Sequence, residues 1–197
     1  MNLIKISKMS GKLKGIPAIN TNTLSNEFCK KASKNKDSIC GICYSVNMLK
    51  TFRKNCVDPF EHNSKMLSSD VIPIQYLPKF NSIAVRFNAH GELINQTHLI
   101  NLFNICKANL RVTFTLWTKR TDILKKVLRT HKKPKNIILI FSNSKLDAPI
   151  KPSKIYDKTF NNVTSQTSKI NCFKDCFNCM KCYDQSDPDE IITEHIK

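Results

Sequence analysis

Four cysteines close to the C-terminus are the residues of this chain whose type and spacing best suit chemistry. They are Cys172, Cys176, Cys179 and Cys182. Gaps of three, two and two residues bring the four sulfurs around one point and leave little chain for disulfides to cross-link. Thiolates at this density favour a soft cation, so we predict an iron–sulfur cluster. A four-cysteine zinc site is the alternative, although zinc ligands usually come in two pairs from distant turns.

A second and looser group lies towards the N-terminus and consists of Cys29, Cys40 and Cys43. Without a secretory signal, these two groups indicate a reducing compartment and metal binding rather than disulfides. Three thiolates leave one iron of a [4Fe-4S] cluster open to a further ligand, whereas four close it. The sequence therefore predicts one open and one closed site, unless cysteines from both groups share one cluster. The remaining cysteines, Cys56 and Cys106, are expected to pack as small hydrophobic residues.

The net charge of +17 is unevenly distributed, with Lys and Arg concentrated in residues 1–58 and 107–158. Such basic blocks suit a polyanion, nucleic acid above all, because each neutralised phosphate releases counterions. A lysine-rich solubilising surface is the simpler alternative. The chain carries no apolar run typical of a signal peptide or a membrane span, so we expect a cytoplasmic protein that does not contact a membrane.

Hydrophobic periodicity predicts alternating strands and helices. Strands are expected at residues 15–20, 82–88, 111–117, 136–142 and 160–165. Helices are expected at residues 45–68 with a break near Asp58, at 96–108, and at 121–129 with Thr121 as its cap. This order indicates an α/β fold with a parallel sheet, either open or an incomplete (βα) barrel, since there are too few units for eight.

The predicted domain organisation is simple. Residues 1–183 are expected to form a single α/β domain that includes the cysteine-rich segment at 171–183. Residues 184–197 are expected to form an acidic tail, either as a short solvated helix or as a flexible end.

Polar residues follow the predicted strands, where the carboxyl ends of a parallel sheet collect ligands. We therefore expect these loops and the first cysteine group to face one cavity. The candidate residues for binding an anionic substrate are Arg86, Asn88, His90, Lys119 and Arg120. Hydrolase chemistry is disfavoured, because the chain has neither a glycine-rich phosphate loop nor a Gly-x-Ser-x-Gly or His-Glu-x-x-His motif.

A strand, a loop ending in Cys-x-x-Cys-Tyr, and a second strand ending in Gly-Glu resemble the start of a radical S-adenosylmethionine (SAM) enzyme. The resemblance implies that the first cysteine group holds a [4Fe-4S] cluster. It also implies that Tyr44, Gly91 and Glu92 contact the cofactor, with the Gly-Glu segment on the methionine amine. The chain differs from that pattern in having ten residues between Cys29 and Cys40, and His90 at the first glycine position.

A closer resemblance is to the bacteriophage gene product 88 family, which is radical-SAM-like in appearance. The matching segments are residues 11–17, 40–44, 85–92, 116–120 and 172–182. The resemblance implies a [4Fe-4S] phage protein that acts in redox sensing or nucleic-acid binding. The alternatives are a radical SAM enzyme acting on a nucleotide or nucleic acid, and a zinc-binding structural or nucleic-acid-binding protein.

Overall fold

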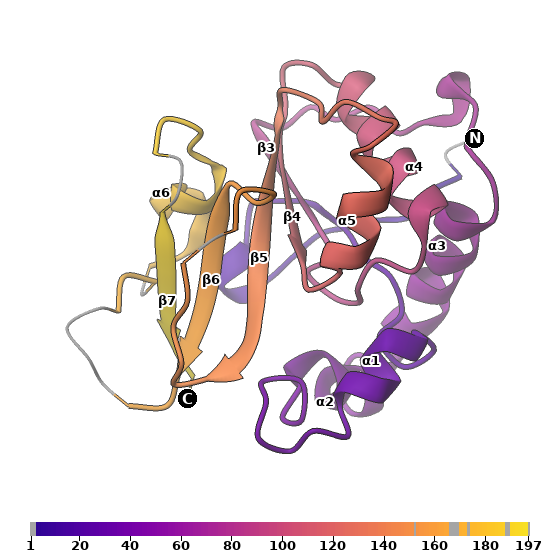
Figure 1. Ribbon diagram of the computed structural model, residues 1–197. Helices are drawn as coiled ribbons and strands as arrows, with labels where there is room; N and C mark the ends of the chain where they lie inside the picture. Colours follow the sequence, from indigo (N-terminus) through magenta and orange to yellow (C-terminus); the bar gives the residue numbers. More distant parts are fainter. Residues whose placement is uncertain (1–2, 152, 166–169, 173, 188–189, 197) are drawn as a thin grey trace.

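The computed structural model describes residues 3–151, 153–165, 170–172, 174–187 and 190–196. Its centre is a seven-stranded sheet in which the strands lie side by side in chain order (Figure 1). The strands are β1 (Ile6–Ser7), β2 (Ala18–Ile19), β3 (Ala84–Phe87), β4 (Thr113–Thr118), β5 (Ile137–Leu146), β6 (Lys158–Val163) and β7 (Ile191–His195). Among the described strands β1 and β2 pair antiparallel and the other neighbours pair in parallel, so the prediction of an α/β fold built on a mostly parallel sheet is confirmed.

Helices connect the strands. They are α1 (Glu27–Ala32), α2 (Tyr44–Lys50), α3 (Val57–Ser69), α4 (Gln96–Lys107), α5 (Thr121–Val127) and α6 (Cys176–Cys179). Short 3-10 helices lie at Gly11–Leu13, Lys54–Cys56, Ile74–Tyr76 and Lys181–Tyr183. In Figure 1, α3, α4 and α5 lie on one side of the sheet, and α1 and α2 lie at the edge where the strands end. Within the described part of the chain, no helix combines the length and hydropathy needed to cross a membrane.

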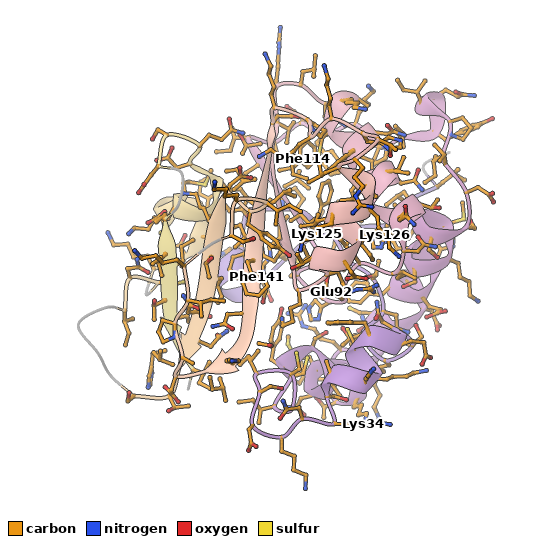
Figure 2. All side chains as sticks on the ribbon, in the orientation of Figure 1. Lys34, Glu92, Phe114, Lys125, Lys126 and Phe141 are labelled. Carbon is orange, nitrogen blue, oxygen red and sulfur yellow. The ribbon has the colours of Figure 1, made fainter. Side chains whose placement is uncertain are left out.

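Alternate residues of each strand face two different layers. On β4, Phe114 and Leu116 join the main hydrophobic core with Leu99 and Leu102 of α4, and Figure 2 shows Phe114 beside the helices. On the opposite face, Ile140 of β5 belongs to a second cluster, which Trp117, Cys172 and Cys182 cover. The helices therefore cover one face of the sheet and the cysteine-rich segment covers the other.

Two details of the predicted helices are wrong. The break near Asp58 lies earlier, at residues 51–56, and α3 runs through Pro59. A proline in the first turn is tolerated because N–H groups there have no intrahelical acceptor. Thr121 does not cap α5: Arg120 occupies the capping position, and the Thr121 hydroxyl lies 2.9 Å from the Tyr156 hydroxyl.

The last described residues are not a tail but contain β7, which pairs in parallel with β6. Its Ile192 is buried against Ile140 and Phe160. The acidic composition of this segment concealed the strand, because a carboxylate next to it is neutralised inside the protein. Glu190 lies just before β7, and its Oε2 is 2.9 Å from Nζ of Lys158 on β6.

Lys158 is 1% exposed and its ammonium also donates to the Asp187 carbonyl at 2.9 Å. Removing the carboxylate with Glu190→Ala leaves a buried, uncompensated cation. We expect this change to lower the free energy of unfolding by about 3–5 kcal/mol, as measured by urea denaturation.

The matched control is Glu27→Ala, which breaks an exposed Lys30–Glu27 pair of 2.7 Å and should change stability little. The double variant Glu190→Leu with Lys158→Met should recover much of the loss, because it removes both charges together. Equal effects of Glu190→Ala and Glu27→Ala would contradict the assigned role of the buried pair.

Candidate functional site: a cavity between two cysteine groups

A cavity of about 720 Å³ opens where the parallel strands end. It brings together all three cysteines of the first group and most of the polar residues predicted from the strand ends. The predicted residues that line it are Cys29, Cys40, Cys43, Tyr44, Arg86, Asn88, His90, Gly91, Glu92, Lys119, Cys172 and Cys176. The structure thus places both cysteine groups beside one cavity, while Cys179, Cys182 and Arg120 lie outside its lining.

Separate anchors hold the first cysteine group at the strand ends. Asn26 caps α1 by accepting from the Cys29 N–H at 3.1 Å, and its side-chain amide donates to the Glu92 carbonyl at 3.0 Å. The segment before Cys40 is fixed by the Ile39 N–H, which donates to the Ser144 carbonyl of β5 at 3.0 Å. The cysteine loop is therefore attached to the ends of two different strands.

Burial strongly perturbs the thiols of this group. Desolvation raises the pKa of Cys29 above its ordinary range, and the negative charges of Glu92, Cys43 and Cys40 act in the same direction. Desolvation also raises the pKa of Cys40, whereas the Lys119 ammonium lowers the pKa of both thiols. A thiolate here therefore needs a nearby positive charge.

The four C-terminal cysteines line a second cavity of about 20 Å³. Cys172 and Cys176 border both cavities. Burial raises the pKa of Cys172 to about 11, and it also raises the pKa of Cys176 and Cys182. A void of this size holds roughly one water-sized body.

Hydrogen bonds from backbone and side-chain groups hold the C-terminal cysteine group in place. The Cys172 N–H donates to the Thr193 carbonyl of β7 at 3.1 Å. Asp175 caps α6 by accepting from the Asn178 N–H at 3.0 Å. Lys12 donates to the Cys172 carbonyl at 3.3 Å, which connects the N-terminal 3-10 helix to this segment.

The donor set of both groups is that of a soft-metal site, since thiols predominate. In the described residues, however, no three His, Cys, Asp or Glu side chains are arranged so that they could hold a metal ion. The residue types therefore suit a soft metal, but their present positions do not. Metal ligation requires the thiols to reorient towards a common centre.

His90 is a buried, neutral ring rather than a cationic contact. Its Nδ1 lies 2.8 Å from the Ser45 hydroxyl, and its ring centroid lies 5.5 Å from that of Tyr44 and 5.3 Å from that of Phe60. Burial lowers the pKa of His90 to about 4, and the charges of Arg53 and Arg86 add to this effect. His90 therefore contributes no positive charge to the cavity at neutral pH.

Glu92 lies in the turn after β3 and contacts the end of β4, and Figure 2 shows it just below α5. Its Oε1 accepts from the Thr118 hydroxyl at 2.5 Å and its Oε2 from the Lys119 N–H at 2.8 Å. Burial raises the pKa of Glu92, and Lys119 and these hydrogen bonds oppose that rise. Much of its hydrogen-bonding capacity is used within the protein, which limits what it can offer to a ligand.

The Arg120 side chain is held by hydrogen bonds within the protein and lies outside the cavity lining. Its Nε and Nη2 contact Asp122 at 2.8 and 2.7 Å, and its Nη1 donates to the Leu93 carbonyl at 3.0 Å.

Trp117 lines the cavity, although it is not among the residues predicted from the sequence. The signal for Trp117 was present, because it alternates with the core residues of β4 and so faces the same layer as Arg86.

Fold and site together define an α/β protein with a cysteine-lined cavity at the carboxyl edge of its sheet. The family model described as Gene product 88 matches residues 3–185. The chain therefore belongs to the phage gene product 88 family. No curated protein and no solved structure matches it.

Gly91 fits its position for two reasons. Its φ is +86°, and an added Cβ would lie 2.1 Å from Oγ1 and 2.5 Å from the carbonyl oxygen of Thr21. The Gly91 N–H also donates to the Thr23 hydroxyl at 2.9 Å, and this hydrogen bond packs the turn against the end of β2.

We expect Gly91→Ala to lower the free energy of unfolding by about 2–4 kcal/mol in a urea titration, because the added Cβ would clash with Thr21.

Gly11→Ala is the control for backbone strain alone, because Gly11 has a φ of +60° and no atom within 4 Å of its added Cβ. It should cost roughly 1–2 kcal/mol. If both variants lose the same stability, the close approach of Thr21 does not constrain the site.

Proposed function

We propose that this phage protein binds a [4Fe-4S] cluster in the cavity, through Cys29, Cys40 and Cys43. The observation that carries the proposal is that these three thiols, separated by up to 14 positions in the sequence, line one cavity. A cluster held by three thiolates supplies one-electron chemistry and keeps one iron open to a further ligand. Such a site suits redox sensing, and the net charge of +17 supports a nucleic-acid partner for the same protein.

The chain's own residues support thiolate formation in this cavity. The Lys119 ammonium lowers the pKa of Cys29 and Cys40, against the larger effect of burial. Lys119 is held in place by its donation to the Ser142 hydroxyl at 2.8 Å. We infer that Lys119 and the anchored cysteine loop prepare the thiols for a cationic metal centre.

For the C-terminal group we propose a second metal site, made of Cys172, Cys176, Cys179 and Cys182. Four thiolates close a cluster or a tetrahedral zinc site. The cavity of about 20 Å³ among them favours a single ion, so zinc is the principal alternative here. The site would secure the segment that covers one face of the sheet.

A second candidate function is a radical SAM enzyme acting on a nucleotide or nucleic acid. In its favour, Gly91 and Glu92 line the same cavity as the three cysteines, and the volume suits a ligand of nucleotide size. Against it, Glu92 already accepts from Thr118 and Lys119. Equilibrium dialysis of anaerobically reconstituted protein with S-adenosylmethionine distinguishes the two functions, because only the enzyme requires it to bind.

The first test is iron, sulfide and zinc content with an absorption spectrum, on protein purified without oxygen. We expect roughly four irons for each cluster and broad visible absorption. Cys40→Ser should lose the iron of the first site, since it removes a ligand from the cavity. The matched control is Cys56→Ser, whose thiol lies outside both cavities and should leave the iron content unchanged. Zinc without iron in the wild-type protein would contradict the cluster proposal.

The C-terminal site is tested by Cys179→Ala, which changes a cysteine outside the larger cavity. We expect it to lose metal from this segment only and to make residues 170–187 more sensitive to limited proteolysis, because metal binding couples to local folding. Cys56→Ala serves as the control. Unchanged metal content with unchanged protease resistance would contradict a metal site among these four cysteines.

A further inference from the structure

Arg86 is a cationic side chain that pairs with none of the described carboxylates. It lies on the sheet face opposite the helices, where its guanidinium stacks on the Trp117 ring at 3.8 Å from the centroid. Its Nε is buried and has no hydrogen-bond partner, and no carboxylate of the described residues forms an ion pair with it. A buried N–H donor without an acceptor is costly, so this arrangement suits a ligand that brings acceptor oxygens to the guanidinium.

Two further buried donors beside Arg86 have no acceptor within the described part of the chain. They are Nδ2 of Asn88 and Nε1 of Trp117, and both residues line the large cavity. Asn88 is only 5% exposed and adopts a φ of +55° directly after β3. All three orphan atoms are N–H donors, and they come from β3, from the residue that follows it and from the adjacent strand β4. Donors without acceptors suit a ligand group that presents several acceptor oxygens.

The remaining charges of the cavity agree with an anionic ligand. Its other cationic side chains are Lys12, Arg53 and Lys119, and its carboxylates are Glu92 and Glu194. Glu194 pairs with Lys12, and Glu92 accepts hydrogen bonds from Thr118 and Lys119 at the end of β4. Neither carboxylate compensates Arg86.

Aromatic surface lies next to these donors. The rings of Trp117 and Phe160 contact each other with centroids 4.1 Å apart, and both residues line the cavity. A cavity of about 720 Å³ accommodates a ligand with an organic body as well as a charged group.

We propose that Arg86, Asn88 and Trp117 form an oxyanion subsite, which binds the phosphate or carboxylate group of an organic ligand of up to nucleotide size. The inference deepens the proposed function, because it assigns ligand chemistry to the cavity that holds the first cysteine group. The guanidinium supplies charge and paired donors, while the amide and indole N–H groups fix the orientation of the oxygens.

The test uses the purified full-length protein and two probes, inorganic phosphate followed by ³¹P NMR line broadening, and malonate as a competitor. We expect phosphate to bind in the millimolar range and malonate to displace it. Arg86→Met keeps an apolar stem of similar length and should weaken phosphate binding about tenfold or more. Trp117→Phe keeps the ring, loses the N–H, and should weaken binding by a smaller factor. The relative affinity of the two probes identifies phosphate or carboxylate as the preferred source of the oxyanion.

Arg111→Met is the matched control, because Arg111 is exposed and lies outside the cavity lining. It should bind phosphate as the wild type does, and circular dichroism should show that all three variants are folded. Absence of phosphate binding, or equal binding by wild type and Arg86→Met, would overturn the subsite.

The metal-deficient Cys40→Ser variant separates this inference from the proposed function. It should retain phosphate binding that depends on Arg86. Loss of iron with retained phosphate binding supports both assignments. A phosphate signal that disappears in Cys40→Ser but persists in Arg86→Met would place the anion on the metal and refute the subsite. If the wild-type protein contains no metal but still binds phosphate through Arg86, the cluster proposal is refuted and the oxyanion subsite is retained.

Discussion

Parallel pairing from β2 to β7 places the carboxyl ends of these strands at one edge of the sheet, and the site depends on this constraint. The turn after β3 carries His90, Gly91 and Glu92, and the end of β4 leads into Lys119. The cysteine loop is attached to the same edge through Asn26 and Ile39. Residues far apart in the sequence therefore meet around a single cavity.

The second face of the sheet makes the two cysteine groups interdependent. Helices cover one face, and the other is closed by the segment that contains the C-terminal cysteines. This segment is held by β7 and by the buried pair of Lys158 and Glu190. Because Cys172 and Cys176 border both cavities, a change at either of these two cysteines alters the lining of the larger one.

The electrostatics of the cavity combine two opposing effects. Burial raises the pKa of the thiols and so favours their neutral form. Lys119 acts in the opposite direction near the first group, and Arg86 does so near Cys176 and Cys182. Four cationic side chains line a cavity with few free carboxylates, which suits ligands that bring negative charge.

Sequence alone determined the α/β class and the central strands such as β5, because local hydrophobic periodicity fixes these features. It also indicated that polar residues gather at the strand ends, because the carboxyl ends of parallel strands lie at one edge of the sheet. It also predicted the cysteine groups as metal ligands, which stays a prediction. Only the tertiary structure decided that residues 191–195 form a strand, because their burial depends on Ile140 and Phe160 in distant strands. It likewise decided that Arg120 donates to the Leu93 carbonyl, while Arg86 stacks on Trp117 and forms no ion pair with the described carboxylates. Residue type cannot reveal such differences, since these contacts are set by how separate segments pack.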